Sequence, residues 1–274
     1  MESASQMSEM DALKARLRAT WIAGDFGQIA KFLAREGEAF VNRLGLKPGM
    51  KVLDVACGTG NLSLPAARLG ATVTGIDIAP NLIEQARANA AAAGLSAGFD
   101  EGDAEALPYE DANFDVVMTM YGAMFAPRPD LVAAELKRVT KPGGVIAMAN
   151  WTPTGFIGQM FKATAAHVTP PAGMQSPVLW GKEDVVRERF GDGVSKVEAT
   201  PRIVSFDFPF SPAEVVEHFR VYYGPTNKAF GALDETKQAA LRHDLEQLWA
   251  TNNKATDGTT SVAAEYLEVI ATRA

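Results

Sequence analysis

The chain has 274 residues, of which 47% are hydrophobic and 22% are charged, and these values exclude a disordered or fibrous protein. Its net charge of −7 argues against nucleic acid or a membrane as the main partner, because both attract basic surfaces. One cysteine and three histidines exclude an intrachain disulfide and leave little for a metal site, so we expect no metal and a cytoplasmic location.

The N-terminal region is predicted to be a short leader followed by two helices. Residues 1–10 are polar and contain neither the basic nor the apolar part of a signal peptide, so we expect a disordered leader. Apolar residues at helical spacing predict a helix over residues 13–21. A glycine-containing break over residues 24–27 separates it from a second helix over residues 28–44.

The middle of the chain alternates between short apolar runs and helical segments. Strands are expected over residues 51–56, 71–76, 114–120 and 144–151, and helices over residues 61–69, 80–93 and 128–139. Strand–helix alternation builds a parallel sheet with helices on both faces, so the predicted fold class is α/β.

The composition changes after Trp151, because residues 151–274 hold 14 of the 23 aromatic residues. Helices are expected over residues 156–167, 182–190, 212–223 and 234–252, and strands over residues 196–200, 203–208 and 262–272. No Ser/Gly-rich linker separates two halves. We therefore predict a single domain over residues 11–274, with lid helices in 11–45, a ligand-binding core in 46–151, a cap with edge strands in 152–253 and a final strand in 254–274.

The sharpest local signal is a strand that runs into the loop Asp54-Val55-Ala56-Cys57-Gly58-Thr59-Gly60. Glycines let a backbone approach a ligand closely, and ligands of open α/β sheets bind at the carboxyl ends of strands. The next predicted strand ends at Asp77, whose carboxylate can accept hydrogen bonds from both hydroxyls of an adenosine ribose. The pattern therefore indicates an adenosine-containing ligand.

Three adenosine ligands are compatible with a loop of this kind. A P-loop requires a lysine that is absent, and a dinucleotide loop requires a third glycine where Ser63 stands. Asp54 would repel a pyrophosphate and attract an ammonium group. S-adenosylmethionine carries an ammonium group and no phosphate, so it is favoured. An NAD-dependent oxidoreductase and a non-catalytic cofactor-binding module are the competing interpretations.

With these residues the chain resembles the class I S-adenosylmethionine-dependent methyltransferases, in the small-molecule branch related to the ubiquinone/menaquinone-biosynthesis enzymes. The resemblance covers residues 20–151 well. Besides residues 54–60 and Asp77, the segments that carry it are residues 21–30, 102–108, 114–117 and 138–144. It implies a Rossmann-like, mostly parallel seven-stranded sheet with an antiparallel last strand and a helical cap insertion.

The same resemblance implies roles for individual residues in binding S-adenosylmethionine. The first motif, with Asp54, Ala56, Gly58 and Gly60, would wrap the methionine part of the cofactor. Asp77 would bind the ribose. The adenine would contact Ile78, Asp103 and Ala104, and the remaining cofactor-binding residues would be Trp21, Phe26, Met120 and Tyr121.

The methyl acceptor is the least determined part of the prediction. Met124, Phe125 and Trp151 are expected to line its site, although each could equally be a core residue. The candidates for proton transfer are Tyr121, His167, His218 and Tyr223. The (Asp/Asn/Ser)-Pro-Pro-(Tyr/Phe) motif of family members that act on nucleobases is absent. We predict in-line methyl transfer to a small aromatic or lipophilic molecule by a monomer or homodimer, with quinone C-methylation as the alternative.

Overall fold

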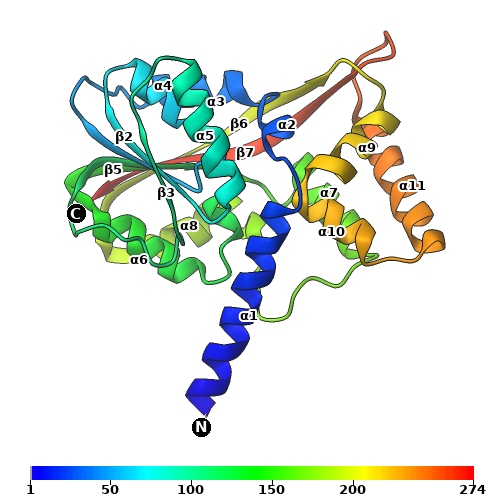
Figure 1. Cartoon of the computed structure of the whole chain (residues 1–274), viewed down its shortest axis with the longest axis horizontal. Helices are drawn as coiled ribbons and strands as arrows, with labels where there is room; N and C mark the ends of the chain where they lie inside the picture. Colours follow the sequence, from blue (N-terminus) through cyan, green and yellow to red (C-terminus); the bar gives the residue numbers. More distant parts are fainter. Residues whose placement is uncertain (1) are drawn as a thin grey trace.

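The centre of the structure is a seven-stranded sheet with the order β3-β2-β1-β4-β5-β7-β6 (Figure 1). The structure is a computed structural model that describes the backbone of residues 2–274 and the side chains of residues 9–274. The first five strands are parallel, and β7 is antiparallel to both of its neighbours, which confirms the predicted fold class. The strands are β1 (Lys51–Val55), β2 (Thr72–Asp77), β3 (Gly98–Glu101), β4 (Phe114–Met120), β5 (Thr140–Trp151), β6 (Val194–Phe208) and β7 (Thr260–Arg273).

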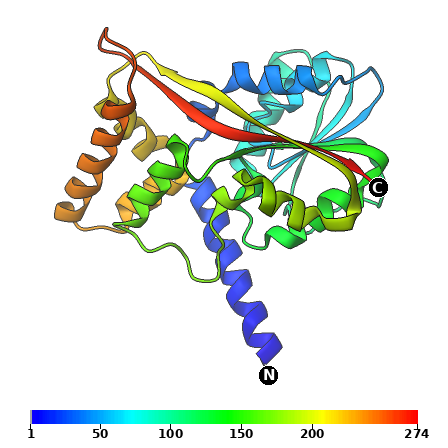
Figure 2. The ribbon, with the colours of Figure 1, turned by 180° about the vertical axis from the view of Figure 1, so that it is seen from behind.

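Helices cover both faces of this sheet, with α3, α4 and α5 on one side and α6 and α8 on the other (Figures 1 and 2). Within residues 2–274, no helix is both long and apolar enough to cross a bilayer. The helices are α1 (Glu2–Ile22), α2 (Gly27–Ala30), α3 (Ala34–Arg43), α4 (Ser63–Arg68), α5 (Pro80–Ala92), α6 (Pro129–Val139), α7 (Phe156–Ala165), α8 (Glu183–Phe190), α9 (Pro212–Tyr222), α10 (Gly224–Gly231) and α11 (Glu235–Asn252), with 3-10 turns at Ala123–Phe125, Pro177–Gly181 and Gly191–Gly193.

Two strands differ from the expectation for physical reasons. The short strand β3 was not predicted, because only Phe99 among its four residues is buried and no apolar run marks it. The two strands expected over residues 196–200 and 203–208 are one strand, β6. Pro201 lies within it and does not end it, because β6 is at the edge of the sheet, where a missing N–H costs no ladder bond.

The N-terminal helices also differ from the expectation. Helix α1 begins at Glu2, so the prediction of a disordered leader over residues 1–10 is wrong for residues 2–10, and Met1 lies outside the described residues. The helix expected over residues 28–44 is divided into α2 and α3 by a turn. At this break the Asn61 side-chain amide donates to the Ala30 carbonyl at 2.8 Å, which replaces a helical hydrogen bond.

A cap of four helices, α7, α9, α10 and α11, lies at one end of the molecule (Figures 1 and 2). Helix α10 was not predicted. The antiparallel ribbon of β6 and β7 extends beyond the parallel strands and carries this cap, because β6 leads into α9 and α11 leads back into β7. Trp249 fills the space between the ribbon and α9, with its ring centroid 5.8 Å from Phe208 and 5.4 Å from Phe219. One hydrophobic cluster includes these residues and the sheet core.

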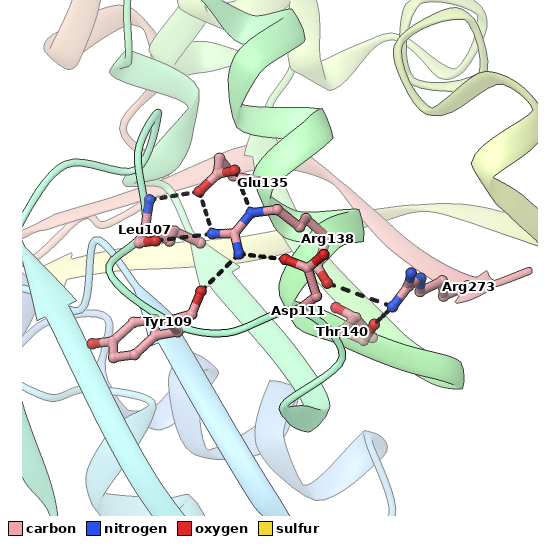
Figure 3. A network of polar contacts seen from close by, with 7 residues as sticks. All are labelled: Leu107, Tyr109, Asp111, Glu135, Arg138, Thr140 and Arg273. Atoms are coloured by element: carbon pink, nitrogen blue, oxygen red, sulfur yellow. Dashed lines mark hydrogen bonds and ion pairs between the residues drawn. The ribbon is translucent and has the colours of Figure 1, made fainter.

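Arg138 fixes the loop that follows β3 (Figure 3). Its guanidinium donates to the carbonyls of Leu107 at 2.9 Å and Tyr109 at 2.7 Å, and to the carboxylates of Glu135 at 2.7 Å and Asp111 at 2.8 Å. Glu135 in turn accepts the Leu107 N–H at 2.6 Å. The side chain of Arg138 therefore joins the end of α6 to the loop.

Candidate active site

A cavity opens at the carboxyl ends of β1, β2 and β4. Asp54 and Asp77 line it from the strand ends, and Leu17 and Trp21 of α1 cover it. Its empty volume is about 1110 Å³ with the open space at its mouth included, and we call it the first cavity.

The loop after β1 bends sharply around this cavity. Ala56 has a φ of 55° and Gly60 a φ of 92°, both in the left-handed region. The Gly60 N–H donates to the Cys57 carbonyl at 2.9 Å, and the Cys57 N–H donates to Ile76 at 3.0 Å. A Cβ on Gly60 would lie 3.5 Å from Leu64 and 3.7 Å from Phe99. Gly60 therefore turns the chain behind the cavity, and Ala56 and Gly58 line it.

Asp77 is held rigidly at the end of β2. One carboxylate oxygen accepts the Gly58 N–H at 2.9 Å, and the other accepts the Ala79 N–H at 2.9 Å. The side chain is 7% exposed, and this burial raises the pKa of its carboxyl group although the two N–H groups oppose the rise. A carboxylate has about four lone-pair positions, so two remain for a ligand.

Asp54 is a buried carboxyl group in the same cavity. It is 1% exposed, and burial raises its pKa to about 7. The Ser63 hydroxyl donates to Asp54 at 2.6 Å, so the residue that replaces the third glycine of a dinucleotide loop supports the carboxylate. A cationic ligand would favour the ionised form of Asp54, and an anionic ligand would oppose it. The charge of this cavity therefore suits an ammonium group and not a pyrophosphate.

Helix α1 is attached to the far side of the cavity by ion pairs. Lys14 contacts Asp103 at 2.5 Å and Glu105 at 2.7 Å, and Arg18 contacts Glu101 at 2.5 Å. The Glu105 side chain is fully buried and also pairs with Arg128 at 2.7 Å. The ion pair of Lys14 therefore ties α1 to the Asp103 loop, whereas the exposed Arg18 pair contributes little.

A second, smaller cavity adjoins the first and has an empty volume of about 350 Å³. The two cavities share Trp21, Phe26, Leu33, Tyr121 and Phe125. Within the described part of the chain, the side chains that line the second cavity are all aromatic or aliphatic and carry no formal charge. They are the five shared residues together with Ile29, Trp151, Ile157, Met160, Phe219 and Tyr223.

Comparison with known protein families shows to which family the chain belongs. The sequence profile of the family described as "Methyltransferase domain" matches residues 46–184, just over half of the chain. The chain belongs to this family. It is an S-adenosylmethionine-dependent methyltransferase, as the resemblance predicted.

Relatives of this methyltransferase extend the match beyond the profile. An uncharacterized protein of Mycobacterium tuberculosis is 40% identical over 241 residues, which cover 87% of this chain and 88% of that protein. The sterol 24-C-methyltransferase ERG6B of Gibberella zeae is 37% identical over 125 residues, or 44% of this chain and 33% of that enzyme. A Haemonchus contortus phospholethanolamine N-methyltransferase 2, solved with S-adenosylhomocysteine, has the same fold, with a TM-score of 0.54, 19% identity and coverage of 87% and 52%.

Most residues that the sequence assigned to the cofactor lie around the first cavity of the methyltransferase. Gly60 is the exception, because it faces Leu64 and Phe99 behind the loop. The assigned residues that line the cavity are Trp21, Phe26, Asp54, Ala56, Gly58, Asp77, Ile78, Asp103, Ala104, Met120 and Tyr121.

The residues expected to line an acceptor site are divided by the structure. Phe125 lines both cavities and Trp151 lines the second. Met124 lines neither and is 2% exposed, so the structure places it in the core and not at either cavity. The 3-10 turn over Ala123–Phe125 causes this, because it directs Phe125 toward the cavities and Met124 into the core.

The four candidates for proton transfer are likewise divided. Tyr121 lines both cavities and Tyr223 the second, whereas the two histidines line neither. His167 pairs with Asp244 at 2.7 Å near the end of α7. His218 contacts the Gln28 carbonyl through Nε2 at 3.1 Å and packs against Phe32, and burial lowers its pKa. The structure therefore gives His218 a packing role between α9 and α2.

Several lining residues were not identified from the sequence. Lys14 lines the first cavity, and the buried carboxylate of Glu105 holds the Lys14 ammonium group in place. Leu33, Ile157, Met160 and Phe219 line the second cavity. None of these residues was marked by the sequence, because they belong to ordinary helical or loop patterns whose partners only the tertiary fold brings together.

Proposed function

We propose that this methyltransferase transfers a methyl group to a small, uncharged, apolar or aromatic acceptor seated in the second cavity. The observation that carries the proposal is the lining of that cavity, which has aromatic and aliphatic walls and no charged side chain among the described residues. Five residues line both cavities, so an acceptor in the second cavity would lie beside a cofactor in the first. Apolar walls with few polar groups are typical of sites for lipophilic molecules.

In this proposal the first cavity holds S-adenosylmethionine. The donor chemistry fits, because two buried carboxyl groups line the cavity and the one lining cation among the described residues, Lys14, is already paired with Asp103. Asp54 would hold the ammonium group and Asp77 the ribose hydroxyls. Ile78, Asp103 and Ala104 would contact the adenine, while residues 11–45 serve as the lid and residues 152–253 as the cap.

The residues of the chain would act mainly by positioning and by excluding water. Bound S-adenosylmethionine would supply an electrophilic methyl group on a sulfonium. Trp21, Phe26 and Phe125 line both cavities, and the ring centroid of Trp21 lies 5.9 Å from that of Phe26 and 5.1 Å from that of Phe125. These packed rings would shield the reacting region from solvent. Alignment of this kind can lower a barrier by about 7–11 kcal/mol. The nearest titratable groups of the second cavity are phenols, so the acceptor must be a nucleophile that needs no strong base.

Methyl transfer to carbon is a second candidate. The identity with a sterol 24-C-methyltransferase over 125 residues favours it, because that enzyme's name specifies a lipophilic acceptor and a carbon atom. An electron-rich carbon of an alkene or hydroquinone would also fit an uncharged cavity. Its attack would release S-adenosylhomocysteine, and the cation formed would then lose a proton to water. The position of the new methyl group, read by NMR from the product, separates this candidate from transfer to oxygen, nitrogen or sulfur.

The test is a two-step measurement on the full chain. Isothermal titration with S-adenosylhomocysteine should show stoichiometric binding, and absence of binding would contradict the cofactor site. Methyl transfer from labelled S-adenosylmethionine is then measured with apolar phenols and alkenes, and with amino acids and polyamines. We expect turnover only in the apolar set. Turnover confined to the charged set would contradict the acceptor assignment.

A substitution inside the second cavity provides the matched control. Met160→Phe adds volume to the wall of that cavity at a site that does not line the first. It should lower acceptor turnover at least about tenfold and leave the titration with S-adenosylhomocysteine unchanged. Equal loss of both would show that the two cavities are not separate sites.

A further inference from the structure

Tyr121 has a strained backbone at the junction of the two cavities. Its φ is 58°, in the left-handed region that bulky residues rarely adopt, and such outliers are typical of functional sites. The next residue, Gly122, packs so closely that an added Cβ would lie 2.6 Å from the Ala56 Cβ and 2.8 Å from the Ala56 carbonyl oxygen. The chain is therefore forced to turn at Tyr121 by contact with the loop after β1.

This turn fixes the Tyr121 ring firmly. The ring stacks on Trp151 with a centroid distance of 3.7 Å and an interplanar angle of 10°. Tyr266 meets it edge-on at 5.5 Å, and the Tyr121 N–H donates to the Ala149 carbonyl at 2.8 Å. Few rotations of the side chain are compatible with these contacts, so the hydroxyl is held in one place.

The hydroxyl of Tyr121 is buried and has no hydrogen-bond partner within the protein. The adjacent polar groups are already paired with each other. The Tyr266 hydroxyl donates to Glu36 at 2.5 Å, and Arg43 donates to Tyr266 at 3.0 Å and to Glu36 at 2.9 Å. An unpaired buried hydroxyl costs about 1–3 kcal/mol, so its retention at a strained position calls for a partner from outside the chain.

We propose that the Tyr121 hydroxyl binds the methyl acceptor by donating a hydrogen bond to an oxygen of that molecule. Tyr121 lines both cavities, and no other residue that lines the second cavity has a buried, unpaired polar atom in the described part of the chain. The inference rests on the proposed function and narrows its substrate class. The acceptor is an apolar skeleton that bears a hydroxyl or carbonyl oxygen close to the atom that is methylated.

Burial supports the direction of this hydrogen bond. It raises the pKa of Tyr121 well above the ordinary value for a phenol, so the hydroxyl keeps its proton. A neutral phenol can donate to the acceptor oxygen but cannot act as a strong base. Tyr121 would therefore select and orient the acceptor, and the proton of a protic acceptor would not be transferred to it.

The test compares 2-naphthol with naphthalene, two probes of the same shape that differ in one oxygen. Their affinities are titrated on the full chain saturated with S-adenosylhomocysteine. The ratio of the two affinities should fall about five- to tenfold in Tyr121→Phe, which keeps the ring and its stacking. Tyr222→Phe removes a cap hydroxyl that lines neither cavity, and it should leave the ratio as in the wild type.

Three results would overturn the inference, and they are distinguishable. An unchanged ratio in Tyr121→Phe would show that the hydroxyl does not contact the oxygen of the probe. Loss of S-adenosylhomocysteine binding in Tyr121→Phe would assign the hydroxyl to the cofactor. Binding of neither probe to any of the loaded proteins would show that the second cavity is not an acceptor site, and the proposed function would then fail as well.

Discussion

The two cavities are built in opposite ways. The walls of the first include backbone turns and carboxyl groups fixed by hydrogen bonds, as at Asp77, which is held by Gly58 and Ala79. The walls of the second are aromatic and aliphatic side chains from α1, the sheet and the cap, in contact through rings such as Trp21 and Tyr223 at 5.9 Å. One cavity is specified by a few polar groups close in sequence, and the other by packing between distant segments.

Because of this difference, single substitutions should have different effects in the two cavities. Loss of one carboxylate in the first cavity removes a directed, charge-assisted contact, and such contacts contribute about 1.5–3 kcal/mol each. Loss of one apolar contact in the second cavity changes its shape and leaves the remaining walls in place. Binding of the cofactor should therefore respond sharply to single polar substitutions, whereas acceptor choice should shift gradually.

The largest effect is expected from Asp77→Ala. Two hydrogen bonds to the ribose would be lost together with the anchors for the Gly58 and Ala79 N–H groups, so S-adenosylhomocysteine should bind at least about 100-fold more weakly. Isothermal titration measures this change. Asp100→Ala, at the exposed neighbouring strand β3, is the control and should bind normally. An affinity for Asp77→Ala within threefold of the wild type would contradict the assignment.

Arg138→Ala should destabilise the loop after β3 beside the first cavity, although Arg138 itself lines neither cavity. It removes hydrogen bonds to two carbonyls and two carboxylates that hold the loop after β3 (Figure 3), so we expect a loss of about 2 kcal/mol in the free energy of unfolding. Urea denaturation measures it. Lys237→Ala, which breaks an exposed helical pair with Asp234, is the control with an expected loss below about 0.5 kcal/mol. Equal losses would refute the anchoring role.

The affinity for S-adenosylhomocysteine should depend on pH through Asp54. Its pKa in the free protein is about 7, and an ammonium ligand prefers the ionised carboxylate. Below pH 7 a proton must be displaced on binding, so affinity should fall as the pH decreases, by up to about tenfold per unit. Titrations between pH 5.5 and 7.5 in wild type and Asp54→Asn measure this. The variant should bind more weakly with a shallower slope, since only the raised pKa of Asp77 then contributes. Identical slopes would contradict the role of Asp54.

The smallest effect is expected on the cap side, from His218. Burial lowers the pKa of this histidine below its ordinary value of 6.5, so the unfolded chain binds a proton more readily than the folded one. Stability should therefore decrease as the pH falls below about 6.5. His218→Phe keeps the ring between Phe32 and Phe208 and removes the titration. The free energy of unfolding of the wild type relative to His218→Phe, measured over pH 5–7, should decrease as the pH falls. A difference that does not change with pH would show that His218 does not contribute.

The sequence predicted the first cavity far better than the second. The loop from Asp54 to Gly60, the acid at Asp77 and their order along the chain are local patterns, and the structure brings them together as expected. Even there, two details could not be predicted. Gly60 supports the turn from behind the cavity, and Lys14 pairs with Asp103, which is 89 positions away in the sequence. Ion pairs at such separations leave no periodic signal.

The second cavity depends on the direction of each side chain, which the sequence does not contain. Met124 and Phe125 are adjacent, apolar and equally placed after β4, yet the 3-10 turn sends one into the core and the other into the cavity. Met160 and Phe219 lie on helices that were predicted, but the cavity they share forms only when α7 and α9 meet α1 and α2. The second cavity is a property of that packing.

The position of β7 has a consequence for how the chain folds during synthesis. In the described sheet, β6 pairs with β7 alone, and β7 follows both β6 and the entire cap in the sequence. At about 5–20 residues per second, the ribosome exposes β6 for seconds before its partner emerges. Val204, Phe206 and Phe208 then alternate along an unpaired strand, which is an aggregation-prone arrangement. Emergence of β7, and not formation of the parallel strands, therefore sets the moment at which β6 can pair and the ribbon that carries the cap can form.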